Sequence, residues 1–289
     1  LRRSRGLGDV YKRQVNKCQG PSSNQTLQIV KKNLGIKKAG HFGPIDPLAS
    51  GLLVIGVNKG TKLSNLFLND NKSYEVSIKF GESTTTDDAE GEVIVTSKKK
   101  FTKSDVVNTL RSFLGAQKQV PPIYSAIKIK GTPSYKHARA GREIQLAPRS
   151  INIYEILIRD FSFPLLNLSI SCSKGTYIRS LARDIGISLG SCAYLHSLKR
   201  TKQGNFKLSN AIKANNADLE KIYSIEEATN FLERCDLTLA QMSVLKNAKL
   251  CELKNSDFKD NEFVRLYSQN IFFGIGIYNE NHLFKEFLV

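Results

Sequence analysis

One carboxylate in a restricted loop is the side chain of this sequence that is best placed to do chemistry. Asp46 lies in the segment 39–51, together with three glycines and two prolines. Glycine permits positive φ and close backbone approach, whereas proline fixes its own φ and disfavours helical geometry in the residue before it. Asp46 therefore has few accessible positions, and we take it as the candidate working residue. The alternative is a solvated aspartate in an ordinary turn.

The residues that follow this loop place it next to a core. The run Leu52–Val57 is short and almost wholly apolar, which indicates a buried strand or a buried turn. A carboxylate that precedes such an element is anchored more firmly than one on a loose loop tip. We therefore expect Asp46 at the edge of the protein core.

A cation and an aromatic ring are the next candidates. From Tyr177 onward the apolar spacing is that of a buried helix face, and Arg179 would lie in the first turn of this helix. The helix macrodipole disfavours a cation there, so we expect a specific anionic partner; the alternative is an ordinary surface arginine. Tyr74 lies on a predicted strand, Ser73–Phe80. The alternative interpretation is that Tyr74 is an ordinary, half-buried tyrosine of this strand.

The charge distribution points to a polyanionic partner. The chain of 289 residues holds 43 lysines and arginines against 26 acidic residues, a formal charge of +17. Residues 1–208 hold 34 basic and 14 acidic residues, whereas residues 209–289 hold 9 and 12. A basic first part and a slightly acidic last part favour binding of nucleic acid by the first part. The alternative is a solvated basic surface.

One segment concentrates this basic character. Residues 118–150 hold seven lysines and arginines and one histidine against a single glutamate, interleaved with Tyr124 and Tyr135. Basic and aromatic side chains together are typical of RNA contact, and a surface loop without a ligand is the alternative. The candidates for contact with an RNA backbone are Lys130, Arg139 and Arg142.

The cysteines, the acidic residues and the hydropathy of the chain argue against a disulfide framework, a metal site and a transmembrane helix. The five cysteines form no C-x-x-C pair, and their odd number argues against a closed disulfide framework, which fits a reducing cytoplasm. The acidic run between Thr84 and Gly91 lacks the spacing of a calcium loop, so we expect no metal. No stretch approaches the roughly 18 apolar residues of a transmembrane helix. We expect a soluble, cytoplasmic and monomeric protein.

The other local patterns indicate a mixture of helices and strands. One helix is predicted from Gln25 to Asn33, capped by Asn24 and stopped by Gly35. Another is predicted to begin with a capping box of Thr102 and Asp105 and to end at Gly115. Further helices are predicted over 59–68, 225–234 and 239–246. Further strands are predicted over 151–158, 168–173, 193–201, 263–267 and 272–278.

Four motifs in order resemble one known family. The segment 39–51 resembles the signature GH-x-G-x-LDP-x-A-[ST]-G of the TruB-type tRNA pseudouridine synthases. The segments Lys72–Val76, Gln119–Ala126 and Cys172–Arg179 match further motifs of that family in the same order. The resemblance covers about residues 15 to 289.

The sequence also departs from the commoner family pattern. It does so at Cys18, Phe42, Pro44 and Ile45, of which Phe42 and Pro44 can alter the shape of the Asp46 loop. Residues 1–14 match nothing in the family, and we expect them to be a non-native N-terminal segment. Without their five basic residues and one acidic residue the net charge is +13, which preserves the argument for a polyanionic partner.

The resemblance implies a fold and a division into domains. The family fold belongs to the α+β class, with a central mixed, largely antiparallel sheet flanked by helices. We therefore expect a catalytic domain over residues 15–208, which includes an RNA-binding thumb at about 118–150. Connecting helices and a small PUA-like, β-rich domain are expected over 209–289.

The resemblance also implies roles for individual residues. Asp46 occupies the place of the family's nucleophile, Arg179 that of its ion-pair partner, and Tyr74 that of a tyrosine that stacks on the target base. These three are the expected catalytic residues. The expected substrate-binding residues are His41, Tyr74, Tyr177 and Leu198, although a plain core leucine is the alternative for Leu198.

The implied reaction converts uridine to pseudouridine. It cleaves the N1–C1′ bond, turns the base and forms a C5–C1′ bond, which is redox-neutral and requires no cofactor. An aspartate can attack either C1′ or C6, and the sequence leaves both routes open. The implied substrate is the T-arm stem-loop of tRNA, with uridine 55 flipped out of its stack. Two alternatives remain: a synthase acting on another RNA such as rRNA, and an RNA-folding protein without catalysis.

Overall fold

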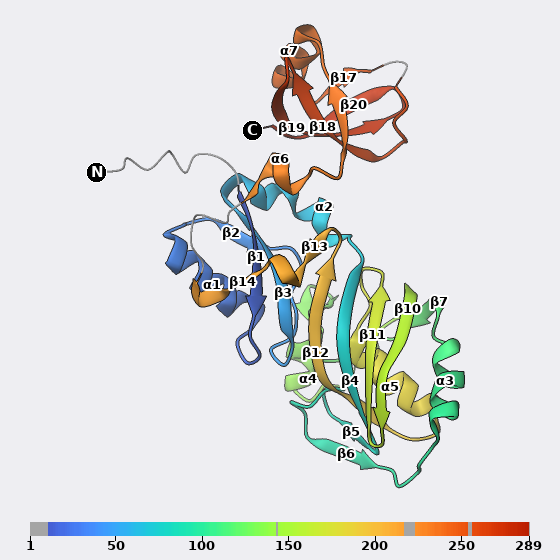
Figure 1. The fold of residues 1–289 in the computed structure, drawn as a ribbon. Coiled ribbons are helices and arrows are strands. Elements are labelled where there is room, and N and C mark those ends of the chain that lie inside the picture. The colour runs from blue at the N-terminus through green and yellow to red at the C-terminus, as the bar shows by residue number, and fades with distance from the viewer. Residues whose placement is uncertain (1–10, 143, 217–222, 254–255, 289) are drawn as a thin grey trace.

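The computed structural model describes residues 11–142, 144–216, 223–253 and 256–288. A large sheet of eleven strands dominates the fold, and a separate sheet of five strands forms the C-terminal part (Figure 1). The five-stranded sheet and the hairpin of β5 (Glu82–Thr84) and β6 (Val93–Thr96) lie at opposite ends of the large sheet. The predicted α+β class, with a small β-rich C-terminal unit, is confirmed.

The large sheet is mixed and largely antiparallel, as predicted. Its main path runs in the order β14-β1-β3-β12-β4-β11-β10-β7. Along this path only the pairs β1–β14 and β3–β12 are parallel. The strands of the sheet are β1 (Tyr11–Lys17), β2 (Ala39–His41), β3 (Ser50–Val57), β4 (Lys72–Phe80), β7 (Gly115–Gln119), β10 (Arg149–Ser162), β11 (Leu165–Cys172), β12 (Ala193–Gln203), β13 (Phe206–Lys207), β14 (Ile212–Lys213) and β15 (Tyr223–Ser224).

Helices cover the apolar face of the sheet. In α5, Ile178, Leu181 and Ile185 recur at helical spacing and are all buried, so they form one apolar stripe. This stripe joins a core cluster that also holds residues of β4, β10, β11 and α3. The helices of the larger part are α1 (Ser23–Leu34), α2 (Ser64–Leu68), α3 (Lys103–Arg111), α4 (Ser134–Arg139) and α5 (Ile178–Ser188), with short 3₁₀ turns at Asn58–Leu63, Leu208–Asn210 and Ala214–Asn216.

Local sequence determines where α1 and α3 begin and where α1 ends. The N-cap of α1 is Ser22, which forms a capping box with Gln25, so the prediction of Asn24 as the cap is wrong. At the other end, Gly35 ends the helix in the left-handed region, as predicted. Thr102 caps α3 as predicted. However, α3 ends before Gly115, which instead begins β7 with a φ of 88°.

The C-terminal unit contains one wrong helix prediction. The helix expected over 225–234 ends at Ala228, and residues 233–236 form a strand that pairs parallel to its neighbour over Val264–Tyr267. Cys235 is buried by that pairing, so tertiary contacts override the local helical pattern. The elements of this unit are α6 (Ile225–Ala228), β16 (Glu233–Asp236), α7 (Leu239–Asn247), β17 (Leu250–Glu252), β18 (Glu262–Ser268), β19 (Ile271–Asn279) and β20 (His282–Leu288).

The N-terminal strand begins earlier than expected. Residues 1–10 of the expected non-native segment lie outside the described residues, but Tyr11 to Gln14 belong to β1 and pair with β3. Such pairing uses backbone groups, which every non-proline residue carries, so it leaves the origin of these four residues open. The domain boundaries at Val15 and near residue 209 stay proposals.

The next two observations concern membrane-spanning helices and cysteines. Among the described residues, no helix is both long and apolar enough to cross a membrane. All five cysteines are free, and three of them, Cys172, Cys235 and Cys251, are buried.

Candidate active site

The loop that carries Asp46 is fixed to the core on both sides. Before Asp46, the N–H of Phe42 donates to Val54 O at 2.8 Å, and the Phe42 ring stacks on Phe67 at 5.1 Å between centroids. A Cβ on Gly56 would lie 2.5 Å from the Phe42 ring, so the small residue makes room for it. Phe42 is 1% exposed, and this departure from the family pattern is therefore a core residue.

Contacts from α1 and β1 hold the rest of the loop. The Ser23 hydroxyl donates to Ile45 O and accepts from Ile45 N–H, both at 2.9 Å. The buried ammonium of Lys17 donates to Ala49 O at 2.6 Å and to Pro47 O at 3.2 Å. Burial lowers the pKa of Lys17, while the nearby charge of Asp46 opposes that effect. Sequence reasoning missed Lys17, because a lone lysine in a strand carries no local signal of such contacts.

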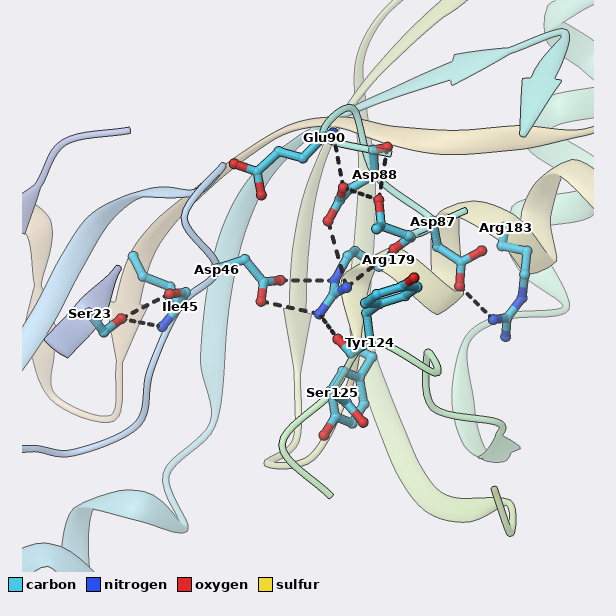
Figure 2. Close-up of polar contacts among 12 residues, drawn as sticks. Ser23, Ile45, Asp46, Asp87, Asp88, Glu90, Tyr124, Ser125, Arg179 and Arg183 are labelled. Atoms are coloured by element: carbon cyan, nitrogen blue, oxygen red, sulfur yellow. Dashed lines mark hydrogen bonds and ion pairs between the residues drawn. The ribbon is translucent and has the colours of Figure 1, made fainter. Parts of the chain in front are cut away.

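Asp46 faces Arg179 in a two-point ion pair. The guanidinium Nε lies 3.0 Å from Asp46 Oδ2, and Nη2 donates to Oδ1 at 3.2 Å (Figure 2). Two parallel contacts between planar groups fix orientation as well as distance. The anionic partner predicted for Arg179 is therefore present, and it is Asp46.

Arg179 is itself held by two further acceptors and by a second carboxylate. It is 6% exposed and donates to Thr86 O at 3.2 Å and to Tyr124 O at 3.0 Å. Its Nη1 also lies 3.6 Å from the carboxylate of Asp88, which is 3% exposed. Figure 2 shows the guanidinium between the two carboxylates. A buried arginine with this many acceptors keeps its place when the cavity is empty.

Asp88 is the main residue that sequence reasoning missed. It lies in the connection between β5 and β6, which the sequence predicted only as a polar hairpin or crossover loop. Its Oδ1 accepts hydrogen bonds from the Thr86 hydroxyl and from Glu90 N–H. The only signal in the sequence was the acidic run itself, and spacing does not distinguish a buried carboxylate from a solvated one.

Opposing effects act on the Asp46 carboxyl. Burial raises its pKa, the guanidinium of Arg179 lowers it, and the negative charge of Asp88 raises it again. The pKa of Asp46 lies above its ordinary value as a result. The ion pair thus offsets part of the cost of placing a carboxylate beside the core.

An open cavity of about 620 Å³ lies in front of the ion pair. It brings together all the residues predicted for catalysis and substrate binding, as well as one of the three predicted RNA-backbone residues, Arg139. Lys130 and Arg142 are exposed and lie outside the lining. The lining includes His41, Pro44, Asp46, Tyr74, Asp88, Tyr124, Tyr135, Arg139, Tyr177, Arg179 and Leu198.

Burial shifts the pKa values of three ring side chains in the lining. Burial raises the pKa of Tyr74 to about 12, and it also raises that of Tyr177. Burial lowers the pKa of His41, so its imidazole is neutral near pH 7. Tyr177 is fixed through its backbone, because the Gln119 side chain accepts from its N–H at 2.8 Å and donates to its carbonyl at 3.0 Å.

The thumb contributes a small hairpin and a helix next to this cavity. Strands β8 (Lys128–Ile129) and β9 (Thr132–Pro133) pair around Lys130 and Gly131, and both turn residues have positive φ. In α4, the Arg139 guanidinium lies 5.6 Å from the centre of the Tyr135 ring. Lys130 therefore lies at an exposed tip, whereas Arg139 lies at the cavity wall.

The side-chain types present suit nucleophilic chemistry. The site offers one oriented carboxylate, one guanidinium, neutral phenols and apolar surface. Within the described ranges, no group of three or more His, Cys, Asp or Glu side chains is arranged to hold a metal ion.

Comparisons with known proteins agree with this geometry. Residues 31–178 match the family model described as "TruB family pseudouridylate synthase (N terminal domain)". The chain is 39% identical over 269 residues to the tRNA pseudouridine synthase B of Clostridium tetani, covering 91% of this chain and 93% of that protein. It is 37% identical over 279 residues to the tRNA pseudouridine synthase B of Francisella tularensis subsp. novicida, covering 94% and 92%.

Solved structures show a related fold. A chain in the crystal structure of a Cbf5-Nop10-Gar1 complex superposes with a TM-score of 0.70 at 20% identity, covering 94% of this chain and 79% of that chain. A chain of an H/ACA RNP bound to a substrate RNA containing 2′-deoxyuridine superposes with a TM-score of 0.69, also at 20% identity. At this identity the likeness concerns the fold alone.

Proposed function

Because the chain belongs to the TruB family of pseudouridylate synthases, we propose that it isomerises uridine 55 in the T loop of tRNA to pseudouridine, with Asp46 as the nucleophile. The observation that carries this proposal is the Asp46–Arg179 ion pair, which faces a cavity lined by aromatic side chains. A family member that keeps the oriented carboxylate and a free space in front of it retains what the reaction needs.

The reaction is balanced without an external reagent. The N1–C1′ bond breaks, the base turns, and a C5–C1′ bond forms; C5 loses a proton and N1 gains one. Asp46 attacks C1′ or C6 to start this sequence, and its ester or adduct is released at the end. No electron is gained or lost, so these residues do not have to hold a redox cofactor.

Arg179 keeps the nucleophile ionised and oriented. The guanidinium lies against both carboxylate oxygens, with Nη2 donating to Oδ1 and Nε within ion-pair distance of Oδ2. Burial and the charge of Asp88 raise the pKa of Asp46, and the cation opposes both effects, so it favours the carboxylate form.

The remaining lining residues form the pocket of the flipped base. Tyr74 stacks on the uracil ring, while Tyr177, Leu198 and His41 complete the wall. A uridine must leave its stack to reach Asp46, and aromatic or apolar surfaces stabilise an extruded base. A cavity of about 620 Å³ lies within the common size range of ligand sites, roughly 300–1,000 Å³.

The thumb positions the RNA. Lys130, Arg139 and Arg142 contact phosphates without reading sequence, whereas the cavity selects the uridine. Arg139, which lies at the cavity wall, is the link between the two tasks. The protein acts as a monomer in the cytoplasm.

The two alternatives make different demands on the site. An RNA-folding protein without catalysis does not need a buried guanidinium and an oriented carboxylate in one cavity. A synthase for another RNA needs the same cavity, so only the position of the modified uridine separates it from the proposal.

The test is incubation with an unmodified tRNA transcript, followed by mapping of pseudouridine at single-nucleotide resolution. We expect modification at position 55, and none with Asp46→Asn, whose amide is nearly isosteric but a poor nucleophile. RNA affinity of Asp46→Asn should stay within about threefold, since the fold and the basic surface are unchanged. Pseudouridine made by a homogeneous Asp46→Asn preparation would remove Asp46 as the nucleophile, and modification at another site would favour a different RNA.

A further inference from the structure

A buried arginine lies beneath the cavity and has no part in the chemistry proposed above. Arg200 of β12 is 1% exposed, and within the described residues no carboxylate forms an ion pair with it. A buried cation without a counter-ion is costly, so its hydrogen bonds must compensate. Those hydrogen bonds identify what Arg200 holds in place.

The guanidinium binds the backbone of the Asp46 loop. Its Nη2 donates to Gly43 O at 2.9 Å and its Nη1 to Pro44 O at 3.4 Å, while Nε donates to Leu52 O at 2.7 Å. These acceptors lie on both sides of Asp46, at the start of its loop and at the start of β3. One rigid fork therefore sets the distance between the two ends of the loop.

The backbone of β12 approaches the loop equally closely. Arg200 pairs with Gly51 of β3 in parallel register, and a Cβ on Gly51 would lie 2.4 Å from Arg200 O. Gly51 also has a φ of 103°, which favours glycine. The residue that ends the loop is thus fitted to the residue that holds it.

Arg200 also contacts Tyr74, its cross-strand partner on β4. Direct cross-strand partners place their side chains on the same face of the sheet, so the guanidinium and the phenol are neighbours, and each shifts the pKa of the other. A guanidinium has donors only, so toward Arg200 the phenol oxygen of Tyr74 can act only as an acceptor. The phenol proton must then point away from Arg200, and Tyr74 lines the cavity together with Asp46.

We propose that Arg200 is a positioning residue, which locks the Asp46 loop to Tyr74 and turns the Tyr74 hydroxyl into a hydrogen-bond donor toward the reacting atoms. This inference rests on the roles proposed for Asp46 and Tyr74. It assigns to β12 a task beyond supplying Leu198: the strand sets the geometry between the nucleophile and the stacking ring.

The first test compares Arg200→Lys with wild type under single-turnover conditions on unmodified tRNA. Lysine keeps the charge but cannot reach Gly43 O, Leu52 O and Tyr74 together, so we expect the rate constant to fall by at least about tenfold. The dissociation constant for tRNA should change by less than about threefold, because Arg200 is buried. The matched control is Lys199→Gln, the neighbouring cation on β12, whose ion pair with Glu75 lies at the exposed surface; its rate should equal that of wild type.

A double-mutant cycle separates positioning from mere stability. Tyr74→Phe removes the hydroxyl. Arg200→Lys should therefore lower the single-turnover rate constant by clearly less in the Tyr74→Phe background than in wild type. If Arg200→Lys does not fold, Arg200→Met takes its place, because an apolar side chain of similar volume removes the buried charge. Circular dichroism and the Tm of each variant establish that it is folded.

The outcomes distinguish this inference from the proposed function. If wild type forms pseudouridine 55 and folded Arg200→Lys or Arg200→Met is equally fast, the positioning role is wrong and the proposed function stands. Strictly additive effects in the cycle would likewise exclude the link to Tyr74. If wild type forms no pseudouridine in tRNA, both proposals are overturned.

Discussion

At the scale of single residues, one guanidinium shared by two carboxylates organises the site. Arg179 contacts Asp46 at 3.0 Å and Asp88 at 3.6 Å. The shorter contact is to Asp46, which is the more exposed of the two carboxylates in the cavity lining. This arrangement keeps Asp46 in one orientation, which suits the nucleophilic role proposed for it.

Arg179→Lys should lower the single-turnover rate by about tenfold to a hundredfold. Lysine keeps the charge but cannot make the two-point ion pair, and a hydrogen bond to a charged group contributes about 1.5–3 kcal/mol. The matched control is Arg183→Lys one turn further along α5, where the arginine pairs with Asp87 at 2.7 Å outside the cavity lining. That variant should keep its rate within about threefold, and unchanged kinetics in Arg179→Lys would remove Arg179 from the site.

The pH dependence of the rate should report on Asp46. Its pKa is raised by burial, lowered by Arg179 and raised by the charge of Asp88, so activity should fall on the acid side as Asp46 becomes protonated. Asp88→Asn removes one of the two raising effects, and the acid limb should therefore move to lower pH. Single-turnover rates between about pH 4.5 and 8 measure this shift. An acid limb that stayed in place or moved upward would mean that another group controls it.

At the scale of elements, we propose that the thumb and the cavity divide the work of recognition. The thumb presents Lys130 at the tip of a hairpin and Arg142 after α4, both exposed and both away from the cavity lining. Exposed cations of this kind bind phosphate through charge and do not discriminate between bases. The rigid strands around Asp46 can then select the uridine by shape.

The triple variant Lys130→Gln, Arg139→Gln, Arg142→Gln should bind tRNA more weakly and with less dependence on salt. For every phosphate that the variant no longer binds, the slope of log K against log salt should flatten by roughly 0.7 to 0.9. The modified position should remain the same. An equal change of charge in the C-terminal unit, Lys246→Gln, Lys249→Gln, Lys259→Gln, is the control and should leave the slope unchanged. A thumb variant that kept its slope, or that modified other uridines, would contradict this division.

At the scale of the whole molecule, one apolar cluster connects the two sheets. Ile275 and Phe287 of the C-terminal unit pack in the same cluster as Leu52, Val54 and Phe67 of the larger part. Leu52 and Val54 belong to β3, the strand that follows the Asp46 loop. The C-terminal unit thus stabilises the scaffold behind the site.

Phe287→Ala should therefore destabilise the catalytic part as well as its own sheet. Phe287 is 2% exposed, and truncation of a buried phenylalanine costs about 3–5 kcal/mol. We expect a lower Tm in a single unfolding transition, measured by circular dichroism and by the decline of activity on heating. Phe284→Ala on the same strand is the control. Phe284 is 38% exposed, so its truncation should lower the free energy of unfolding by less than about 1 kcal/mol. Two separate transitions in Phe287→Ala, with only one of them shifted, would show that the two parts unfold independently.

Much of the fold followed from local patterns in the sequence. The strand over 73–80, the capping box at Thr102 and the apolar face of α5 are confirmed, because each depends on residues a few positions apart. The helix predicted over 225–234 and the cap at Asn24 are wrong. In the first case a parallel strand pairing competed with the helix, and in the second a neighbouring serine made the better cap.

The sequence by itself determined the types of residue at the site, and the tertiary structure decided their partners. Glycines, prolines and an aspartate in one short segment marked Asp46, and an arginine in the first turn of a helix called for an anion. That anion lies 133 positions away, and Arg200 lies 157 positions from the Gly43 carbonyl that it binds. Periodicity and capping act over a few residues, whereas a buried charge finds its acceptors wherever the sheet brings them. Asp88, Lys17 and Arg200 became visible only for that reason.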